Sequence, residues 1–175
     1  MTETKDLADR EKEAWLGLVA LVQLLPGVLD AQLNRDSALT HFEFFALSRL
    51  SEAPGALMRM TALAAATNAS LSRLSHVVTR LEARGLLRRQ PCAEDGRATN
   101  VVLTDQGAAY VGDAAPGHLA TVRSTVMDAL TPEQVSQLAE IAVAVVGAID
   151  PTHRASDVCE SIVAAQRNAE AHHQH

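Results

Sequence analysis

The sequence SLSRLSHVVTRLEARGLLRRQPCAEDGRATNVVL, residues 70–103, decides the fold. Ser70 supplies an N-cap oxygen for a helix, and Gly85 stands where a left-handed residue ends one. Residues 86–90 and 99–103 predict two antiparallel strands joined by a polar tip. The helix is amphipathic because apolar side chains recur along one arc at helical spacing: Leu71, Leu74, Val77, Val78 and Leu81.

The opposite arc of this helix carries short polar and cationic side chains. A helix of about 14 residues is roughly 21 Å long, a length that fits the major groove of DNA. We therefore expect the helix to read duplex DNA through its outer face, which carries Ser72, Arg73, Ser75, His76 and Thr79, flanked by Arg80 and Arg84.

Two further helices are predicted before residue 70. Thr40 and Glu43 form a capping box that starts a helix over residues 41–51. Residues 60–67 form a short Ala-rich helix, and residues 68–69 link it tightly to the next one. Two short helices joined in this way are typical of a helix-turn-helix unit, in which the second helix enters the groove.

The flanking segments predict long helices with wide apolar faces. Residues 11–34 form one helix with an expected kink near Val22 caused by Pro26, and residues 105–130 form another with a kink or break at Pro116. Thr131 and a following proline start a helix that ends near residue 149. The stripe on residues 11–34 fits either burial within one subunit or contact with a second chain. The terminal helices together predict a homodimer.

Composition bounds the remaining possibilities. The chain has 175 residues, of which 47% are hydrophobic and 3% aromatic, so Leu, Val and Ala must build the core. No run of 18 uncharged apolar residues occurs, which argues against a membrane span, and the charged start lacks a signal region. We expect a cytoplasmic, nucleoid-associated bacterial protein without membrane contact.

Charge is unevenly distributed. The net charge is −6, yet the seven arginines between Arg59 and Arg97 outnumber three acidic residues there, which gives this segment +4 and the remainder −10. Phosphate binding depends on the local field rather than on the molecular total, because salt screens charges over about 8 Å. An acidic body with a basic lobe fits a DNA-binding protein, and it also fits an Arg-rich solvated face without a partner.

Three short motifs follow one another in this chain: LEARGLLRR at residues 81–89, DGRA at 95–98 and VLTDQG at 102–107. In this order and spacing they resemble the MarR family of winged helix-turn-helix regulators, over residues 13–149. The resemblance implies a mainly α fold with a small β-hairpin wing (α+β) and dimerisation helices at both ends. Its expected parts are an N-terminal dimerisation helix (1–36), a winged helix-turn-helix lobe (37–103), C-terminal dimerisation helices (104–150) and an extension that allows a short helix and a disordered tail (151–175).

The expected partner is double-stranded DNA with a pseudo-palindromic operator. Arg73 is placed for a guanine edge, and Arg97 for the minor groove. By resemblance, Asp95 holds the wing tip through an arginine, for which Arg88 is a candidate. For Arg80 and Arg84 an ion pair with Glu82 or solvent exposure remains open. The full set of expected DNA contacts is Ser70, Ser72, Arg73, Ser75, His76, Thr79, Arg80, Arg84, Arg88, Asp95 and Arg97.

The resemblance also implies a repressor released by a small aromatic or anionic effector, which favours a dimer with wrongly spaced reading helices. The open alternatives are a winged-helix protein–protein module, or a zinc- or redox-responsive regulator in which Cys92 lies near arginines. No nucleophile with its base, paired carboxylates or phosphate-binding glycines appear, so we expect no enzyme, cofactor or metal. Candidate pocket residues are Trp15, His41, Phe42, Phe45 and Tyr110.

Overall fold

The computed structural model describes residues 6–92 and 98–150, a mainly helical protein with one small sheet. This confirms the predicted fold class. In chain order the elements are α1 (Asp9–Ser37), α2 (His41–Glu52), the 3₁₀ turn η1 (Pro54–Ala56), β1 (Leu57–Arg59), α3 (Met60–Ala66), α4 (Leu71–Ala83), β2 (Leu87–Pro91), β3 (Thr99–Leu103), α5 (Asp105–Thr125), η2 (Met127–Ala129) and α6 (Pro132–Ile149).

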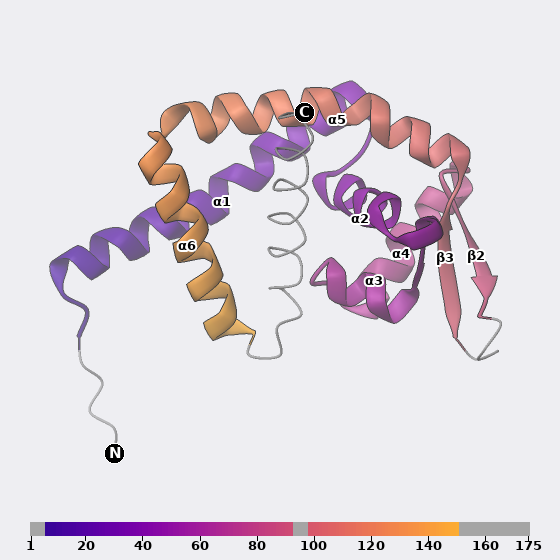
Figure 1. Cartoon of the computed structure of the whole chain (residues 1–175), viewed down its shortest axis with the longest axis horizontal. Helices are drawn as coiled ribbons and strands as arrows, with labels where there is room; N and C mark the ends of the chain where they lie inside the picture. The colour runs from indigo at the N-terminus through magenta and orange to yellow at the C-terminus, as the bar shows by residue number, and fades with distance from the viewer. Residues whose placement is uncertain (1–5, 93–97, 151–175) are drawn as a thin grey trace, which may run out of the picture.

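The elements separate into a lobe and an extended helical arm (Figure 1). Helices α2, α3 and α4 and the sheet form the lobe, while α1, α5 and α6 reach away from it. Helix α5 packs along the C-terminal half of α1 and also contacts α2, so it joins the arm to the lobe. This arrangement leaves α4 on the lobe, away from the free end of the arm.

Burial of one face fixes α4 in the lobe. Leu74, Val78 and Leu81 are fully buried and Val77 is nearly so, and each such side chain contributes about 1.5–3 kcal/mol relative to an exposed one. The predicted assignment of Leu71 to this face is wrong, because its side chain is 50% exposed. Leu71 is the first residue of the helix, where the turn that would cover it has not yet formed.

Both predicted ends of α4 are confirmed. The hydroxyl of Ser70 accepts a hydrogen bond from the backbone N–H of Arg73 at 3.2 Å, as an N-cap does. Gly85 follows the last turn with φ +71°, a left-handed conformation that glycine adopts without a steric penalty. A turn of this kind sends the chain directly into the first strand of the hairpin.

The sheet has one more strand than the sequence predicted. Strands β2 and β3 pair as an antiparallel hairpin, with Leu87 opposite Leu103. The additional strand β1 pairs with the other edge of β3, with Leu57 opposite Val102, so the order is β1-β3-β2. Three residues between a Pro-Gly turn and a helix are too few to show an alternating pattern, which is why β1 was missed.

The prolines do not end the long helices. Helix α1 runs through Pro26, and α5 runs through Pro116 to Thr125, so the alternative of a break at Pro116 is wrong. Helices α1 and α5 pack closely next to Pro116: a side-chain carbon added to Gly117 would lie only 3.2 Å from Nε2 of Gln32. Tertiary packing therefore outweighs the single backbone hydrogen bond that proline removes.

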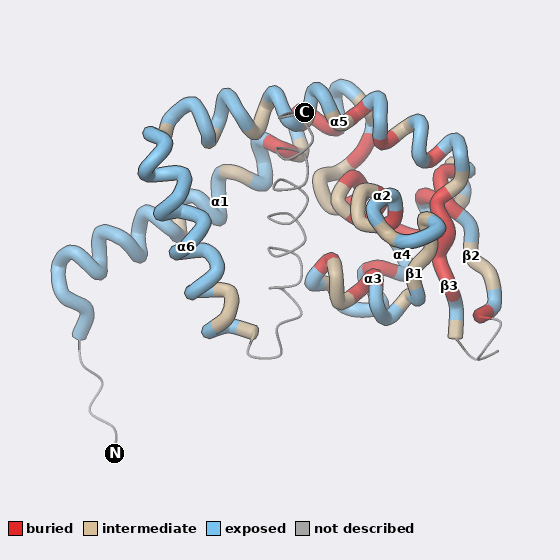
Figure 2. Tube along the Cα trace, viewed as in Figure 1, coloured by how far each residue is buried: buried red, intermediate tan, exposed pale blue. Residues whose placement is uncertain are grey.

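Most of the arm's apolar surface is exposed (Figure 2). In α1 only Leu29, Gln32 and Leu33 are buried, and no residue of α6 is. By length and composition α1 also meets the criterion for a membrane-spanning helix, so the sequence-based exclusion of a span was too strong. The exposed large apolar residues of the arm include Trp15, Leu16, Leu18, Leu21, Val22, Leu24, Val28, Leu119, Val135, Leu138, Ile141, Val143, Val145 and Ile149.

Gly107, the last residue of the VLTDQG motif, lies where α5 passes the backbone of the lobe. A side-chain carbon there would lie 1.9 Å from the carbonyl oxygen of Leu86 and 2.8 Å from Cδ1 of Leu103. We expect Gly107→Ala to lower the free energy of unfolding by about 3 kcal/mol or more, because backbone has to move. Urea denaturation followed by circular dichroism measures this change.

The matched control for that substitution is Gly112→Ala in the same helix. Nothing lies within 4 Å of the carbon it would add, so the better helix propensity of alanine should stabilise the protein by about 1 kcal/mol. Equal effects of the two substitutions would contradict the close approach at Gly107.

Candidate nucleic-acid interface

The outer face of α4 is open to solvent. Ser70, Ser72, Ser75 and His76 are exposed, and none of their side chains belongs to the core. The helix is 13 residues long, close to the predicted length. The backbone carbonyl of Ser75 accepts a hydrogen bond from the hydroxyl of Thr79 at 2.9 Å. The structure thus brings the expected polar residues of this helix onto one face.

Two arginines of α4 are held by residues of α2. The guanidinium of Arg73 lies 4.1 Å from the ring centroid of Phe42, a cation–π distance. Nη2 of Arg80 lies 3.0 Å from Oε1 of Glu43, whose side chain is only 8% exposed while that of Arg80 is 61% exposed. The other oxygen of Glu43 accepts hydrogen bonds from the N–H and hydroxyl of Thr40. The partner of Arg80 is therefore Glu43, and not Glu82 as the ion-pair alternative assumed.

Glu82 instead pairs with Arg89, a residue that the sequence analysis did not include in the site. The pKa of Glu82 is lowered, chiefly because its carboxylate accepts the backbone N–H of Arg89, and also because it pairs with that guanidinium. Nη2 of Arg89 also donates to the carbonyl of Ser75 and to the hydroxyl of Thr79. Arg89 thus ties β2 to α4, and no sequence signal distinguishes it from the exposed Arg88, which donates to Gln90.

Arg84 lies at the C-terminal end of α4 and points to α1 and α5. Its Nη1 donates to the carbonyl of Ala38 at 2.8 Å, and its Nη2 donates to the hydroxyl of Tyr110 at 2.9 Å. Two of its nitrogen atoms are therefore already engaged within the protein.

The wing tip lies outside the described residues, and with it the predicted roles of Asp95 and Arg97. Cys92, just before the tip, is buried, and Nη2 of Arg59 lies 3.6 Å from its sulfur. An arginine of β1, the strand that the sequence analysis missed, therefore contacts this sulfur.

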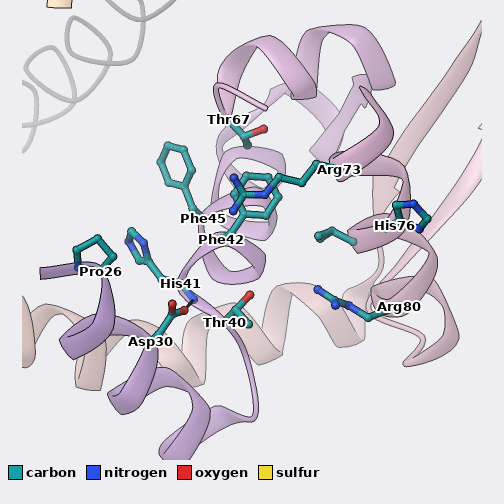
Figure 3. A pocket seen from close by; sticks show the side chains of 11 residues that line it. Pro26, Asp30, Thr40, His41, Phe42, Phe45, Thr67, Arg73, His76 and Arg80 are labelled. Carbon is teal, nitrogen blue, oxygen red and sulfur yellow. Dashed lines mark hydrogen bonds between the residues drawn. The ribbon is translucent and has the colours of Figure 1, made fainter. Parts of the chain in front are cut away.

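A cavity of about 580 Å³ lies between α4 and the arm side of the lobe. Figure 3 shows Pro26 and Asp30 of α1 with His41, Phe42 and Phe45 of α2 on one side, facing the side chains of α4 on the other. Its lining combines aromatic rings with cations, which suits an aromatic anion. The lining residues are Pro26, Asp30, Thr40, His41, Phe42, Phe45, Thr67, Arg73, His76, Val77 and Arg80.

Three of the five predicted pocket residues line this cavity: His41, Phe42 and Phe45. Trp15 does not, because it lies on the exposed face of α1 and is 56% exposed. Tyr110 does not either, because its hydroxyl donates to the carbonyl of Ser37. The α4 residues of the lining were predicted only as DNA contacts, since periodicity gives no information about which helix packs opposite them.

Two histidines meet where α2 and α5 cross. The ring centroids of His41 and His118 are 5.6 Å apart, and His118 packs against Phe44 at 4.7 Å. Burial lowers the pKa of both, and the neighbouring His41 lowers that of His118 further. The carboxylate of Asp30 acts in the opposite direction on His41. Both rings therefore favour the neutral form more than an exposed histidine does.

Within residues 6–92 and 98–150, no group of three or more His, Cys, Asp or Glu side chains is arranged to hold a metal ion. The histidine pair and Asp30 do not form such a group. The zinc-responsive alternative has no support from this part of the chain.

The short helices, the β2–β3 hairpin of the three-stranded sheet and the exposed polar face of α4 define a winged helix-turn-helix protein. Residues 39–99 match the sequence profile of the MarR family. The chain is 38% identical to Sco3205, a MarR family transcriptional regulator from Streptomyces coelicolor solved in complex with DNA, over 87% of this chain and 96% of that one, with a TM-score of 0.83. The chain belongs to the MarR family of transcriptional regulators and is not an enzyme.

Two further solved structures extend the comparison. AbsC, a MarR family transcriptional regulator from the same organism, is 37% identical over 83% of this chain and 98% of that one, with a TM-score of 0.79. BpsR from Bordetella bronchiseptica, whose DNA binding is regulated by 6-hydroxynicotinic acid, shares the fold at 23% identity and a TM-score of 0.69, over 81% of this chain and 97% of that one.

The two buried histidines predict a pH-dependent stability. Because their folded pKa values lie below the unfolded value of about 6.5, the unfolded chain binds more protons, and the free energy of unfolding falls as pH drops below about 7. We expect the melting temperature to decrease as the pH is lowered from 7 to 5.5. The carboxyl groups of Asp36 and Glu82 also have lowered pKa values, but they titrate below this pH range and do not contribute to the change.

The combined variant His41→Asn and His118→Gln removes both titrating rings. Its melting temperature should change less over the same pH range than that of the unsubstituted protein. An unchanged slope would show that other groups cause the pH dependence.

Proposed function

We propose that this MarR family protein is a homodimeric repressor that binds a pseudo-palindromic operator and is released by a small aromatic or anionic ligand. The observation that carries the proposal is the exposed polar face of α4, with its apolar face locked in the core and cations along its length. The DNA complex of Sco3205 supports the assignment of duplex DNA as partner. We place its action in the cytoplasm, at the nucleoid.

The exposed apolar surface of the arm supports the homodimer. Helices α1 and α6 cross in the view of Figure 1, and both expose apolar residues along their length. A soluble chain rarely leaves so large an apolar patch uncovered, and a second copy would cover it by twofold symmetry. The same interface would explain the membrane-like composition of α1.

Two substitutions test the dimer. Leu21→Glu and Ile141→Glu would each place a charge within the proposed interface, on side chains that are 57% and 59% exposed in the single chain. We expect each variant to sediment as a monomer at micromolar concentration, because an unpaired buried charge costs several kcal/mol. Leu71→Glu, on the lobe, is a control of similar exposure, and it should leave the sedimentation coefficient unchanged.

A gel shift with duplexes from upstream of the protein's own gene tests DNA binding. Affinity should fall steeply with salt, as expected when arginines displace counterions from phosphate. Arg73→Ala should relax the preference for one base, by about 1–3 kcal/mol, if Arg73 contacts a guanine edge. Arg73→Lys retains the charge without the two-pronged geometry and should relax the same position. A site selection that is unchanged in both variants would contradict this role.

The cavity supports the ligand. Arg73, His76 and Arg80 belong both to its lining and to the proposed reading face, so a bound anion would compete with DNA for the two guanidinium groups. Regulation requires that the ligand bind the DNA-free state more tightly. Its occupant should therefore carry a carboxylate or phenolate on an aromatic ring, because Phe42 and Phe45 supply the apolar wall.

A panel of phenolic and aromatic carboxylate compounds, added to the gel shift, tests this part of the proposal. We expect an active compound to release the duplex, and Phe45→Ala to raise the concentration required by about tenfold through loss of the apolar wall. Phe45 is not one of the expected DNA contacts, so DNA binding without ligand serves as the internal control. Release that is equally efficient with Phe45→Ala would place the ligand elsewhere.

A further inference from the structure

Helix α1 ends in a way that leaves carbonyl oxygens in need of partners. Its C-cap, Ala38, is left-handed with φ +48°, and the N–H groups of Ala38 and Leu39 return to the carbonyls of Asn34 and Leu33. The carbonyls of Ser37 and Ala38 point onward from the last turn. A helix terminus of this kind carries partial negative charge and accepts donors from neighbouring elements.

Those donors come from the reading helix and from the helix that links arm to lobe. Arg84, at the end of α4, donates to the carbonyl of Ala38 at 2.8 Å and to the hydroxyl of Tyr110 at 2.9 Å. Tyr110 of α5 donates in turn to the carbonyl of Ser37. The guanidinium also lies 5.2 Å from the Tyr110 ring centroid. We call Ser37, Ala38, Arg84 and Tyr110 the capping node.

We propose that Arg84 is a positioning residue for DNA recognition rather than a phosphate contact, and that the capping node sets the angle between α4 and the dimer arm. The proposal rests on the proposed DNA binding. Its geometric basis is that three helices far apart in sequence meet at one guanidinium: the end of α1, the end of α4 and the first turns of α5.

The functional consequence follows from symmetry. In a twofold dimer the separation of the two reading helices depends on how each α4 is held relative to α1, and half-sites lie about one helical turn apart. Binding to an operator requires the correct separation of the two helices, whereas a random duplex is bound through whichever phosphates are within reach. Loss of the node should therefore reduce operator affinity more than affinity for random DNA.

Tyr110→Phe is the sharpest test, because it removes one hydroxyl and no charge. We expect about a tenfold loss of operator affinity in a fluorescence anisotropy titration, with unchanged affinity for a random duplex and an unchanged slope of log K against log salt. Arg84→Gln should show the same pattern, and combining it with Tyr110→Phe should add little, because both act through one node.

Arg84→Lys separates positioning from charge. Lysine keeps the positive charge but cannot donate to Ala38 and Tyr110 with the fixed fork of arginine, so operator affinity should stay low. Arg123→Gln removes a positive charge from an exposed position on α5 outside the node, and it should bind as the unsubstituted protein does. Circular dichroism and melting temperature establish that each variant is folded.

The possible outcomes are distinct. Operator affinity unchanged by Tyr110→Phe overturns the positioning role. So does a salt slope that falls by about one in Arg84→Gln and recovers in Arg84→Lys, because that pattern marks a phosphate contact. If the unsubstituted protein binds no duplex at all, the proposed function itself fails and the positioning role fails with it.

Discussion

Burial of one face of α4 is the constraint on which the rest of the lobe depends. Leu74, Val77, Val78 and Leu81 lie in the core with almost no exposure, so the helix cannot rotate about its axis without exposing them to water, at a cost of several kcal/mol. That fixed rotation determines which side chains face outward. It also brings Arg73 and Arg80 against α2, where Phe42 and Glu43 receive them. The cavity of the lobe forms between the same two helices.

The arm follows a different rule, because most of its apolar side chains stay exposed within the part of the chain that the structure describes. A single subunit satisfies the lobe but leaves α6 without one buried residue. The exposed apolar face of the arm therefore fits the proposed homodimer, in which a second copy covers it. Helix α5 packs against α1 in the arm and against α2 in the lobe, so it connects the two parts rigidly. Changes at the proposed interface would then reach the reading helix through packed elements rather than through a flexible linker.

Local sequence patterns predicted where helices and strands lie better than they predicted which of these elements pack together. Capping signals at Thr40, Ser70 and Thr131 predicted where helices start, because a cap is a local hydrogen bond. Of the two alternatives at Pro116, a kink or a break, the break is wrong, because α5 continues through this residue where it packs against α1. The ion-pair alternative for Arg80 considered Glu82, two residues away, whereas the buried Glu43 that pairs with it lies 37 positions earlier in the chain. Contacts between distant elements, such as the Arg84 bonds and the facing walls of the cavity, leave no local signature.

The arginines of the lobe show why a count of charges does not describe a DNA-binding surface. Arg80 pairs with the buried carboxylate of Glu43, yet its own side chain remains 61% exposed. Thr40 would still donate to the other oxygen of Glu43 if Arg80 turned to phosphate. Arg84 is different, because a carbonyl at a helix end and a tyrosine hydroxyl hold it in a fork. Releasing it would take the guanidinium donor away from the carbonyl of Ala38 at the end of α1. The contact of Arg80 is thus the exchangeable one, whereas the bonds of Arg84 hold α4 in place.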